Sequence, residues 1–511
     1  MADAVSVLDQ FIEKVNRVAV ADFVRPVRPT ADSHESQCDI FIEKRSQAES
    51  SITDPTNWSI SEIQDSFVSG DLTPGALVDR LWQHIDFAEP LIQGWVSFAS
   101  DLKNQASDCD LQISSGVIDK PLLGIPVGIK DLIDVAGLPT LCGSRQTLNI
   151  PVENDAPVIA RLREAGAIIM GKTTTHEYAF GGTTPPTRNP WNLNTVPGGS
   201  SGGSGAVLGA GMVPGALGTD TAGSVRIPAA YCGAVGFMGS TGWVPTNNVA
   251  VLAWSLDHVG AMARNVADTA RIQRVLAGLP FSNTSPSARL PEVIGIPKAV
   301  LEPMHPAVHR AFDSAVSAIE SRGVKIVDVP WPDPDLLEAV GFILMMAESA
   351  AFHRDRMKTP ELFDPQVAEL LESGATVSAV DHIQALRVKS QLAEWFDALM
   401  SATPFIVTPT LPCLPPPLGS DTFTPLDLGT QTQPLATAHT RFTLAANIAD
   451  LPAGSLPCGL SEGFPIGLQI MGRGGSDLGV LDVMAGVEEV LAQAKLWNPG
   501  SVASQFGGIN G

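Results

Sequence analysis

Apolar residues recur at helical spacing near the start of the chain. Between residues 5 and 18 they form one stripe, which consists of Val5, Leu8, Phe11, Ile12, Val15 and Val18. A repeat of about 3.6 residues predicts an amphipathic helix. The following residues, 26–57, are polar and contain several prolines and serines, which predicts a linker or a surface wrap. We therefore expect residues 1–57 to form an N-terminal appendage whose helix packs on its own chain rather than on a second subunit.

Short β-rich runs and helical patterns alternate through the rest of the chain. Ser59-Ile-Ser-Glu62 predicts a capping box at a helix start, and Thr73-Pro74 predicts the start of the next helix. The predicted strands are 125–129, 167–170, 293–296, 324–327 and 405–407, and the clearest helices between them are 155–165 and 309–320. Such alternation predicts an α/β fold with a sheet covered by helices on both faces.

Composition and charge narrow the class of protein. A chain of 511 residues with 44% apolar and 17% charged residues can bury a large core. The net charge of -22 opposes binding to nucleic acid or to anionic lipid. The first residues lack a basic segment followed by an apolar run, and no stretch of about 18 uninterrupted apolar residues follows. We therefore expect a cytoplasmic protein that binds neither nucleic acid nor a membrane.

The six cysteines are scattered along the chain without a C-x-x-C pair, and they are Cys38, Cys109, Cys142, Cys232, Cys413 and Cys458. This spacing indicates neither a zinc site nor a disulfide framework. We expect buried free thiols and no bound metal.

Glycine and serine are concentrated in residues 197–205, PGGSSGGSG, and glycines recur in residues 215–228. Glycine at this density indicates that backbone N–H groups approach another group closely or that the chain adopts positive φ. A flexible linker is the alternative. It is disfavoured because the run continues directly into the apolar residues 206–210 and the β-like residues 213–217.

Two further patterns match known motifs in letters but not in context. Residues 166–173, GAIIMGKT, match a phosphate-binding loop, but here the intervening residues are themselves the predicted strand. Residues 198–202, GGSSG, match the nucleophile elbow, which would make Ser200 the nucleophile of a Ser-Asp-His triad. That elbow requires a preceding strand, whereas residues 190–197 contain two prolines. The sequence alone leaves a late histidine such as His439 open as the base.

Lys130 follows an apolar run that begins at Gly124. A lysine at the end of a buried strand loses hydration, which lowers its pKa and allows the neutral amine to act as a base. The alternative is a surface ion pair with the adjacent Asp131.

Three segments together closely resemble the amidase signature family: GIPVGIKDLIDVAG (124–137), PGGSSGGSGA (197–206) and GTDTAGSVRIPAAYCGAVGF (218–237). Their order and spacing also match. Weaker similarity extends from Trp58 to about Ala494, so the resemblance assigns residues 58–500 to one amidase signature domain. It implies a single large α/β domain whose mixed central β-sheet is flanked by helices on both faces.

The resemblance also implies roles for individual residues. Ser224 corresponds to the nucleophile, Lys130 to the general base, and Ser200 to a bridging serine that a cis peptide bond usually precedes. The backbone N–H groups expected to face the oxyanion belong to Thr221, Ala222, Gly223 and Ser224. Ala222 stands where the family usually has glycine. The implied activity is hydrolysis of carboxylic amide C–N bonds through an acyl-enzyme, without cofactor or metal.

Substrate choice is expected to reside largely outside these motifs, in residues around 280–440. The apolar run 342–346 there predicts either a pocket wall or a core helix. The candidate substrate-binding residues are Tyr178, Phe180, Gly199, Arg226, Phe342 and Met346. Arg226 could hold a substrate carboxylate or pair structurally with Asp220. An apolar wall favours small to medium neutral aliphatic or aryl amides, with esters or carbamates as side substrates.

The alternative function is that of the catalytic A-type subunit of a tRNA-dependent amidotransferase, which shares all three motifs. The acidic charge and the additional N-terminal helix argue against it. A non-catalytic binding module is disfavoured because both serines and the lysine are present. The expected partner is a small-molecule amide, and the sequence leaves a homodimer open.

Overall fold

The computed structural model describes residues 2–20, 40–41, 57–280, 285–503 and 506. Most of the predicted linker 26–57, and Cys38 within it, lies outside the described residues. The described part of this linker is the short strand β1 (Ile40–Phe41) and residue 57. Strand β1 pairs antiparallel with β8 (Arg289–Leu290).

An eleven-stranded sheet forms the centre of the molecule. In spatial order its strands are β10 (Lys325–Asp328), β9 (Val293–Ile296), β11 (Phe405–Pro409), β15 (Phe464–Gly472), β14 (Ala453–Ser461), β6 (Val235–Met238), β7 (His258–Ala263), β5 (Gly215–Asp220), β3 (Pro126–Lys130), β4 (Ile168–Thr173) and β2 (Trp95–Phe98). The pairs β10–β9, β9–β11, β4–β3 and β3–β5 are parallel, and the remaining pairs are antiparallel. The sheet is therefore mixed, and it contains all five predicted strands.

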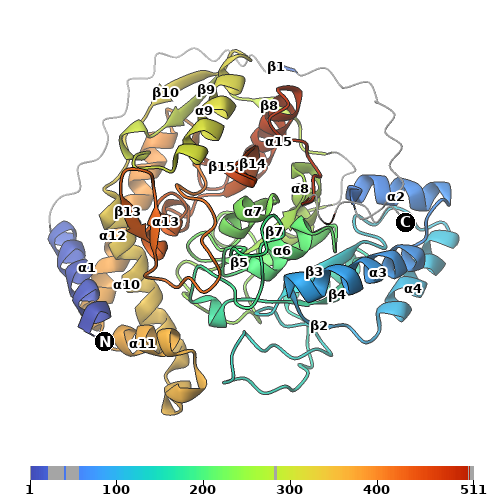
Figure 1. Ribbon diagram of the computed structural model, residues 1–511, viewed down its shortest axis with the longest axis horizontal. Helices are drawn as coiled ribbons and strands as arrows, with labels where there is room; N and C mark the ends of the chain where they lie inside the picture. The colour runs from blue at the N-terminus through green and yellow to red at the C-terminus, as the bar shows by residue number, and fades with distance from the viewer. Residues whose placement is uncertain (1, 21–39, 42–56, 281–284, 504–505, 507–511) are drawn as a thin grey trace.

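Fifteen helices of the described chain surround this sheet and its connections (Figure 1): α1 (Ala2–Val20), α2 (Ile60–Ser69), α3 (Pro74–Ile92), α4 (Leu102–Ser114), α5 (Pro157–Glu164), α6 (Gly202–Gly209), α7 (Arg226–Cys232), α8 (Val266–Leu276), α9 (Pro306–Glu320), α10 (Pro334–His353), α11 (Pro365–Gly374), α12 (Ala379–Met400), α13 (Leu435–Thr440), α14 (Leu444–Ile448) and α15 (Asp477–Gln493). A short hairpin joins β12 (Pro425–Asp427) to β13 (Thr432–Pro434).

The predicted helix starts are present. Ser59 Oγ accepts a hydrogen bond from Glu62 N (3.2 Å), and the Glu62 carboxylate accepts one from Ser59 N (2.7 Å), which completes the capping box of α2. At the start of α3, the Thr73 side chain accepts a hydrogen bond from Ala76 N, and Pro74 lies in the first turn. These bonds satisfy N–H groups that have no partner within the helix.

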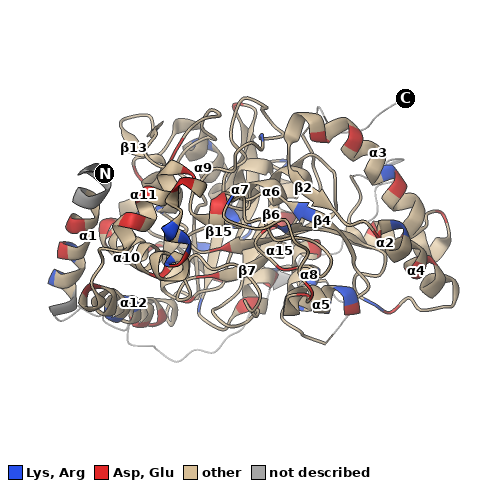
Figure 2. Ribbon diagram, turned by 90° about the horizontal axis from the view of Figure 1, so that it is seen from below, with Lys and Arg blue, Asp and Glu red and all other residues tan. Residues whose placement is uncertain are grey.

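Alternate residues of the strands face opposite helical layers. In β4, Ile168 and Met170 are buried against α3, α4 and α6, whereas Ile169 is buried against α5 and α8. Both faces of the sheet are therefore covered, as the alternating pattern predicted. Figure 2 shows charged residues on outer helices such as α1 and α3, and others at the centre, near α7 and β4.

Helix α1 packs on its own chain, against α10 and α12 at one end of the molecule (Figures 1 and 2). Leu8 and Val15 from its apolar stripe are 1% exposed. Lys14 Nζ lies 2.7 Å from an Asp333 carboxylate oxygen, and Asn16 Nδ2 donates a 2.9 Å hydrogen bond to Asp381. Apolar burial and polar contacts at both neighbouring helices fix the position of α1.

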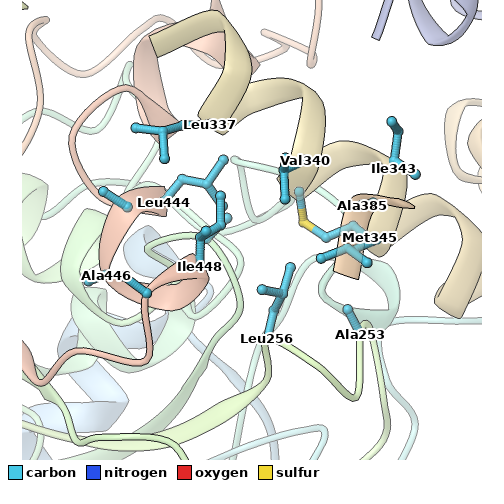
Figure 3. Close-up of a cluster of buried hydrophobic side chains, with 14 of the residues drawn as sticks. Ala253, Leu256, Leu337, Val340, Ile343, Met345, Ala385, Leu444, Ala446 and Ile448 are labelled. Atoms are coloured by element: carbon cyan, nitrogen blue, oxygen red, sulfur yellow. The ribbon is translucent and has the colours of Figure 1, made fainter. Parts of the chain in front are cut away.

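Helix α10 contains the apolar run 342–346 and packs against α14 (Figure 3). Figure 3 shows side chains such as Val340, Met345 and Leu444 converging in a buried cluster. Of the described helices, α10 alone is long and apolar enough to cross a membrane, and 67% of its most apolar 18-residue window is buried inside the protein. This burial is typical of a core helix.

Candidate active site

Lys130 ends strand β3 and is completely buried. Its Nζ donates hydrogen bonds to Ser200 Oγ (2.8 Å) and to Thr219 Oγ1 (2.7 Å) on the neighbouring strand β5. Burial lowers the pKa of Lys130 to about 7, although the negative charges of Asp220 and Asp257 oppose the shift. Neutral Lys130 is thus substantially populated near neutral pH, which a base requires.

The alternative surface pair of Lys130 with Asp131 is wrong. Asp131 instead forms a 2.9 Å ion pair with Lys172, and both side chains are fully buried. Lys172 is the lysine of the GAIIMGKT match, and it lies within strand β4. It therefore has the structural role that the strand context favoured.

Ser200 lies in the turn that leads into α6, and the peptide bond between Gly199 and Ser200 is cis. The carbonyl oxygen of Ser200 accepts hydrogen bonds from His176 N (3.1 Å) and Thr184 Oγ1 (3.2 Å). A Cβ on Gly199 would lie 2.4 Å from the Thr183 carbonyl oxygen, so no side chain fits there. The glycines of this segment permit the close backbone approach that their density indicated.

Ser224 lies in the turn between β5 and α7 and lines a pocket. Gly223 precedes it with φ +122°, and a Cβ at this position would lie 2.5 Å from Thr443 Oγ1. Thr443 Oγ1 in turn donates a 2.6 Å hydrogen bond to the Ala222 carbonyl oxygen. Glycine is therefore required at position 223, and Thr443 holds the turn against the segment between α13 and α14.

The predicted set of oxyanion donors needs one correction. The Gly223 N–H donates a 2.7 Å hydrogen bond to the Asp220 carboxylate, so it does not face the pocket. Within the described residues, no acceptor pairs with the N–H groups of Thr221, Ala222 and Ser224. These three remain as candidate donors.

Arg226 has a structural position. It is fully buried, and its Nε and Nη2 donate hydrogen bonds of 3.0 and 2.9 Å to the Asp220 carboxylate. Its Nη1 donates to the Thr443 carbonyl oxygen (2.8 Å) and to Gln469 Oε1 (2.7 Å). Burial alone would raise the pKa of Asp220, but Arg226 and Asn447 hold it well below its usual range. Because its guanidinium is occupied by protein acceptors, Arg226 is not available to a substrate carboxylate.

The pocket at Ser224 encloses about 570 Å³ of empty space, including its open mouth. Its lining contains no aspartate, glutamate, lysine or arginine among the described residues, and consists of Ala179, Phe180, Gly181, Gly182, Gly199, Thr221, Ala222, Ser224, Ile227, Leu252, Phe342, Met345, Leu370, Thr422, Leu435, Ala436, His439 and Thr440. The lining is predominantly apolar, which suits a neutral ligand.

Three predicted substrate-binding residues, Phe180, Gly199 and Phe342, line this pocket. Tyr178 and Met346 do not. The Tyr178 ring packs in a buried cluster, with its centroid 4.2 Å from that of the His353 ring. The backbone of Met346 faces α11, where Gly374 approaches its carbonyl group. Met345 takes the expected place of Met346 in the wall.

The wall also contains Leu370 on α11 and Leu435 on α13. Both lie in the region 280–440 that was expected to determine substrate choice, but no sequence pattern singled out either residue. His439 on α13 was considered only as a base for Ser200. Its Nε2 instead lies 3.0 Å from the Tyr231 hydroxyl. The side-chain nitrogen that forms a hydrogen bond with Ser200 Oγ is Lys130 Nζ. The Ser-His arrangement of a nucleophile elbow is therefore wrong.

Asp257 was also missed, although it lies between Trp58 and Ala494, the range over which the weaker family similarity extends. Its carboxylate accepts hydrogen bonds from Thr221 Oγ1 (2.6 Å) and from the N–H groups of Leu252 (2.9 Å) and Ala253 (3.0 Å). Burial raises the pKa of Asp257 to about 6. Asp257 thus connects the turn that precedes Ser224 to the pocket wall.

The described cysteines, Cys109, Cys142, Cys232, Cys413 and Cys458, are buried free thiols. In the same part of the chain, no group of three or more His, Cys, Asp or Glu residues is arranged to hold a metal ion.

Comparisons with known proteins place the chain among its relatives. The family model described as Amidase matches residues 76–481. An amidase of Pseudomonas putida is 35% identical over 426 residues, which cover 80% of this chain and 90% of that protein. The A-type subunit of the glutamyl-tRNA(Gln) amidotransferase of Roseiflexus castenholzii is 33% identical over 459 residues, which cover 81% and 92%. A solved amidase structure, 30% identical, superposes with a TM-score of 0.78 over 86% of this chain and all of that one.

Proposed function

The chain belongs to the amidase signature family, and from this premise we propose that it hydrolyses the C–N bond of neutral carboxylic amides through an acyl-enzyme on Ser224. The observation that carries the proposal is the buried contact of 2.8 Å between Lys130 Nζ and Ser200 Oγ, beside a pocket that Ser224 lines.

In the proposed reaction, neutral Lys130 accepts a proton from Ser200, which accepts one from Ser224 as Ser224 Oγ attacks the carbonyl carbon. The N–H groups of Thr221, Ala222 and Ser224 face the developing oxyanion, since no protein acceptor within the described residues occupies them. The proton returns through Ser200 to the leaving nitrogen, and the C–N bond breaks. Water then attacks the acyl-enzyme and releases the carboxylic acid.

The pocket favours uncharged substrates. Moving a charged group from water into an apolar site costs free energy unless an opposite charge or several hydrogen bonds compensate. The described lining offers no acidic or basic side chain, and Phe342, Met345 and Leu370 supply apolar surface. We therefore propose small to medium aliphatic or aryl amides as substrates, with esters and carbamates as side substrates.

A second candidate follows from the similarity to the A-type subunit of glutamyl-tRNA(Gln) amidotransferase, which extends over 92% of that relative. Its substrate class would include glutamine, whose α-ammonium and α-carboxylate groups require charged or strongly polar partners. The uncharged lining supports the amidase proposal instead. Hydrolysis of aryl amides by the purified chain alone, without glutaminase activity, would separate the two functions.

The direct test combines a substrate screen with labelling. We expect the purified protein to hydrolyse neutral amides and to react with a fluorophosphonate, and Ser224→Ala to lose both activities. Ser314→Ala, which changes an exposed serine on α9, serves as the control and should retain both. Full turnover in Ser224→Ala would refute the proposal.

A further inference from the structure

His439 is a polar residue of the pocket that the proposed reaction does not use. It lies on α13, lines the pocket and is 2% exposed. Burial lowers its pKa to about 3, so the imidazole is neutral at ordinary pH. A neutral imidazole has one nitrogen that donates a hydrogen bond and one that accepts.

The neighbours of His439 indicate which nitrogen is which. Nε2 lies 3.0 Å from the Tyr231 hydroxyl, and that hydroxyl lies 3.3 Å from the Leu414 carbonyl oxygen. A carbonyl oxygen only accepts, and the tyrosine has a single hydroxyl proton. The Tyr231 hydroxyl also lies 3.2 Å from Cys413 Sγ. All three contacts are satisfied when Tyr231 donates to Leu414, while its oxygen accepts from Nε2–H and from the Cys413 S–H. Nδ1 is then the accepting nitrogen.

Nδ1 is buried and has no hydrogen-bond partner within the described protein. Gly182, which also lines the pocket, lies beside it, and a Cβ on Gly182 would be 2.7 Å from Nδ1. Because glycine has no side chain, no Cβ of residue 182 fills the space beside this nitrogen. A buried acceptor without a partner is unfavourable, so a ligand that supplies a donor gains affinity relative to one that does not.

The position of His439 relative to Ser224 is fixed by Thr443. Thr443 Oγ1 lies within hydrogen-bond distance of both the His439 carbonyl oxygen (3.0 Å) and the Ala222 carbonyl oxygen (2.6 Å). The helix that carries His439 is therefore anchored to the turn that carries Ser224. Such anchoring allows one polar contact to select among substrates.

We propose that His439 is a specificity-determining residue, whose Nδ1 accepts a hydrogen bond from an O–H or N–H group of the substrate outside the scissile amide. This inference rests on the proposed function. The preferred substrates are then neutral amides that carry one additional hydrogen-bond donor on an otherwise apolar group. An analogue without this donor leaves Nδ1 unpaired and binds less tightly.

The test measures how strongly amides protect Ser224 from fluorophosphonate labelling. The probes are phenylacetamide, its three ring-hydroxylated isomers and the three corresponding methoxy compounds, which accept but do not donate hydrogen bonds. In the unmodified protein we expect at least one hydroxy isomer to protect about tenfold better than phenylacetamide and than its methoxy counterpart, as one net hydrogen bond implies. In His439→Leu this ratio should fall to about one, and His439→Asn, which places an amide oxygen near the Nδ1 position, should restore part of it.

Gly182→Ala provides a second variant that keeps the histidine itself. Gly182 does not have positive φ, so alanine suits its backbone. The new Cβ would lie 2.7 Å from both Nδ1 and Leu435 Cδ2, so these side chains must shift slightly, and it would cover Nδ1. We expect this variant to lose the preference for a hydroxy isomer as well. If His439→Leu does not fold, Gly182→Ala provides the test of whether Nδ1 accepts a hydrogen bond from the substrate.

Two results would overturn the inference: equal protection by hydroxy and methoxy compounds in the unmodified protein, or a hydroxy preference that persists in His439→Leu or Gly182→Ala. Failure of the proposed function itself has a different signature, because Ser224 would then not be labelled by the fluorophosphonate at all.

Discussion

The most informative prediction concerns the protonation of Lys130. Its pKa of about 7, lowered by burial from 10.5, leaves about half of the amine neutral at pH 7, compared with about 0.03% for an unperturbed lysine. The buried position therefore raises the population of the base by roughly a thousandfold. Because the neutral form is the active one, the rate should rise with pH up to about 7 and then level off. Below about pH 6 it should fall by about tenfold per unit.

The assay is the second-order rate constant of Ser224 acylation by a fluorophosphonate, measured from pH 5 to 9 with kcat/KM for a neutral amide in parallel. Lys130→Met should remove this pH dependence together with most of the rate. Asp257 is the nearby group that could imitate the profile, since its own pKa is raised to about 6 by burial. Asp257→Asn should retain the profile with its midpoint shifted to lower pH, because the negative charge of Asp257 raises the pKa of Lys130. A rate that is constant from pH 5 to 9, or that increases toward acid, would refute a neutral-lysine base.

Three further predictions concern residues around and beyond the site. Asp220→Asn should destabilise the protein by about 3 to 5 kcal/mol in urea unfolding, because it leaves buried Arg226 without its counter-ion; an unchanged midpoint would contradict the importance of this pair. Gly223→Ala should abolish Ser224 labelling by displacing the turn from Thr443, and labelling at the normal rate would show that the turn tolerates a Cβ. Burial raises the pKa of Glu488 to about 8, so its contribution to stability is fully present below about pH 4.5 and is lost as the pH rises through 8. Glu488→Gln should therefore raise the melting temperature at pH 8 and leave it nearly unchanged at pH 4.5, and an equal effect at both values would argue against this titration.

The sequence predicted the sheet, its helical covering and the burial of Lys130 because these depend on local patterns, whereas the pairing of Lys130 with Ser200 was implied only by the family resemblance. A lysine at the end of a buried strand is buried wherever that strand lies, and the cap at Ser59 involves residues three apart. Element boundaries were less accurate. Strand β11 continues to Pro409, two residues beyond the predicted end, as the antiparallel partner of β15.

The sequence could not predict which N–H groups near Ser224 are free. Gly223 looks equivalent to its neighbours until the Asp220 carboxylate is placed beside it, and that placement depends on the buried pair with Arg226. The pocket wall was predicted only in part for a similar reason. Leu370, His439 and Phe342 line one pocket only after three separate helices have packed, and no local pattern specifies that arrangement.

The arrangement of the site along the chain has a practical consequence for protein engineering. The residues proposed for bond cleavage all precede position 225, whereas much of the pocket wall comes from α10, α11 and α13, between residues 334 and 440. A mutagenesis library confined to these three helices can alter which amides enter while the reactive serine and its lysine stay unchanged. The same separation offers a physical route by which proteins that share one reaction centre could diversify in the molecules they consume.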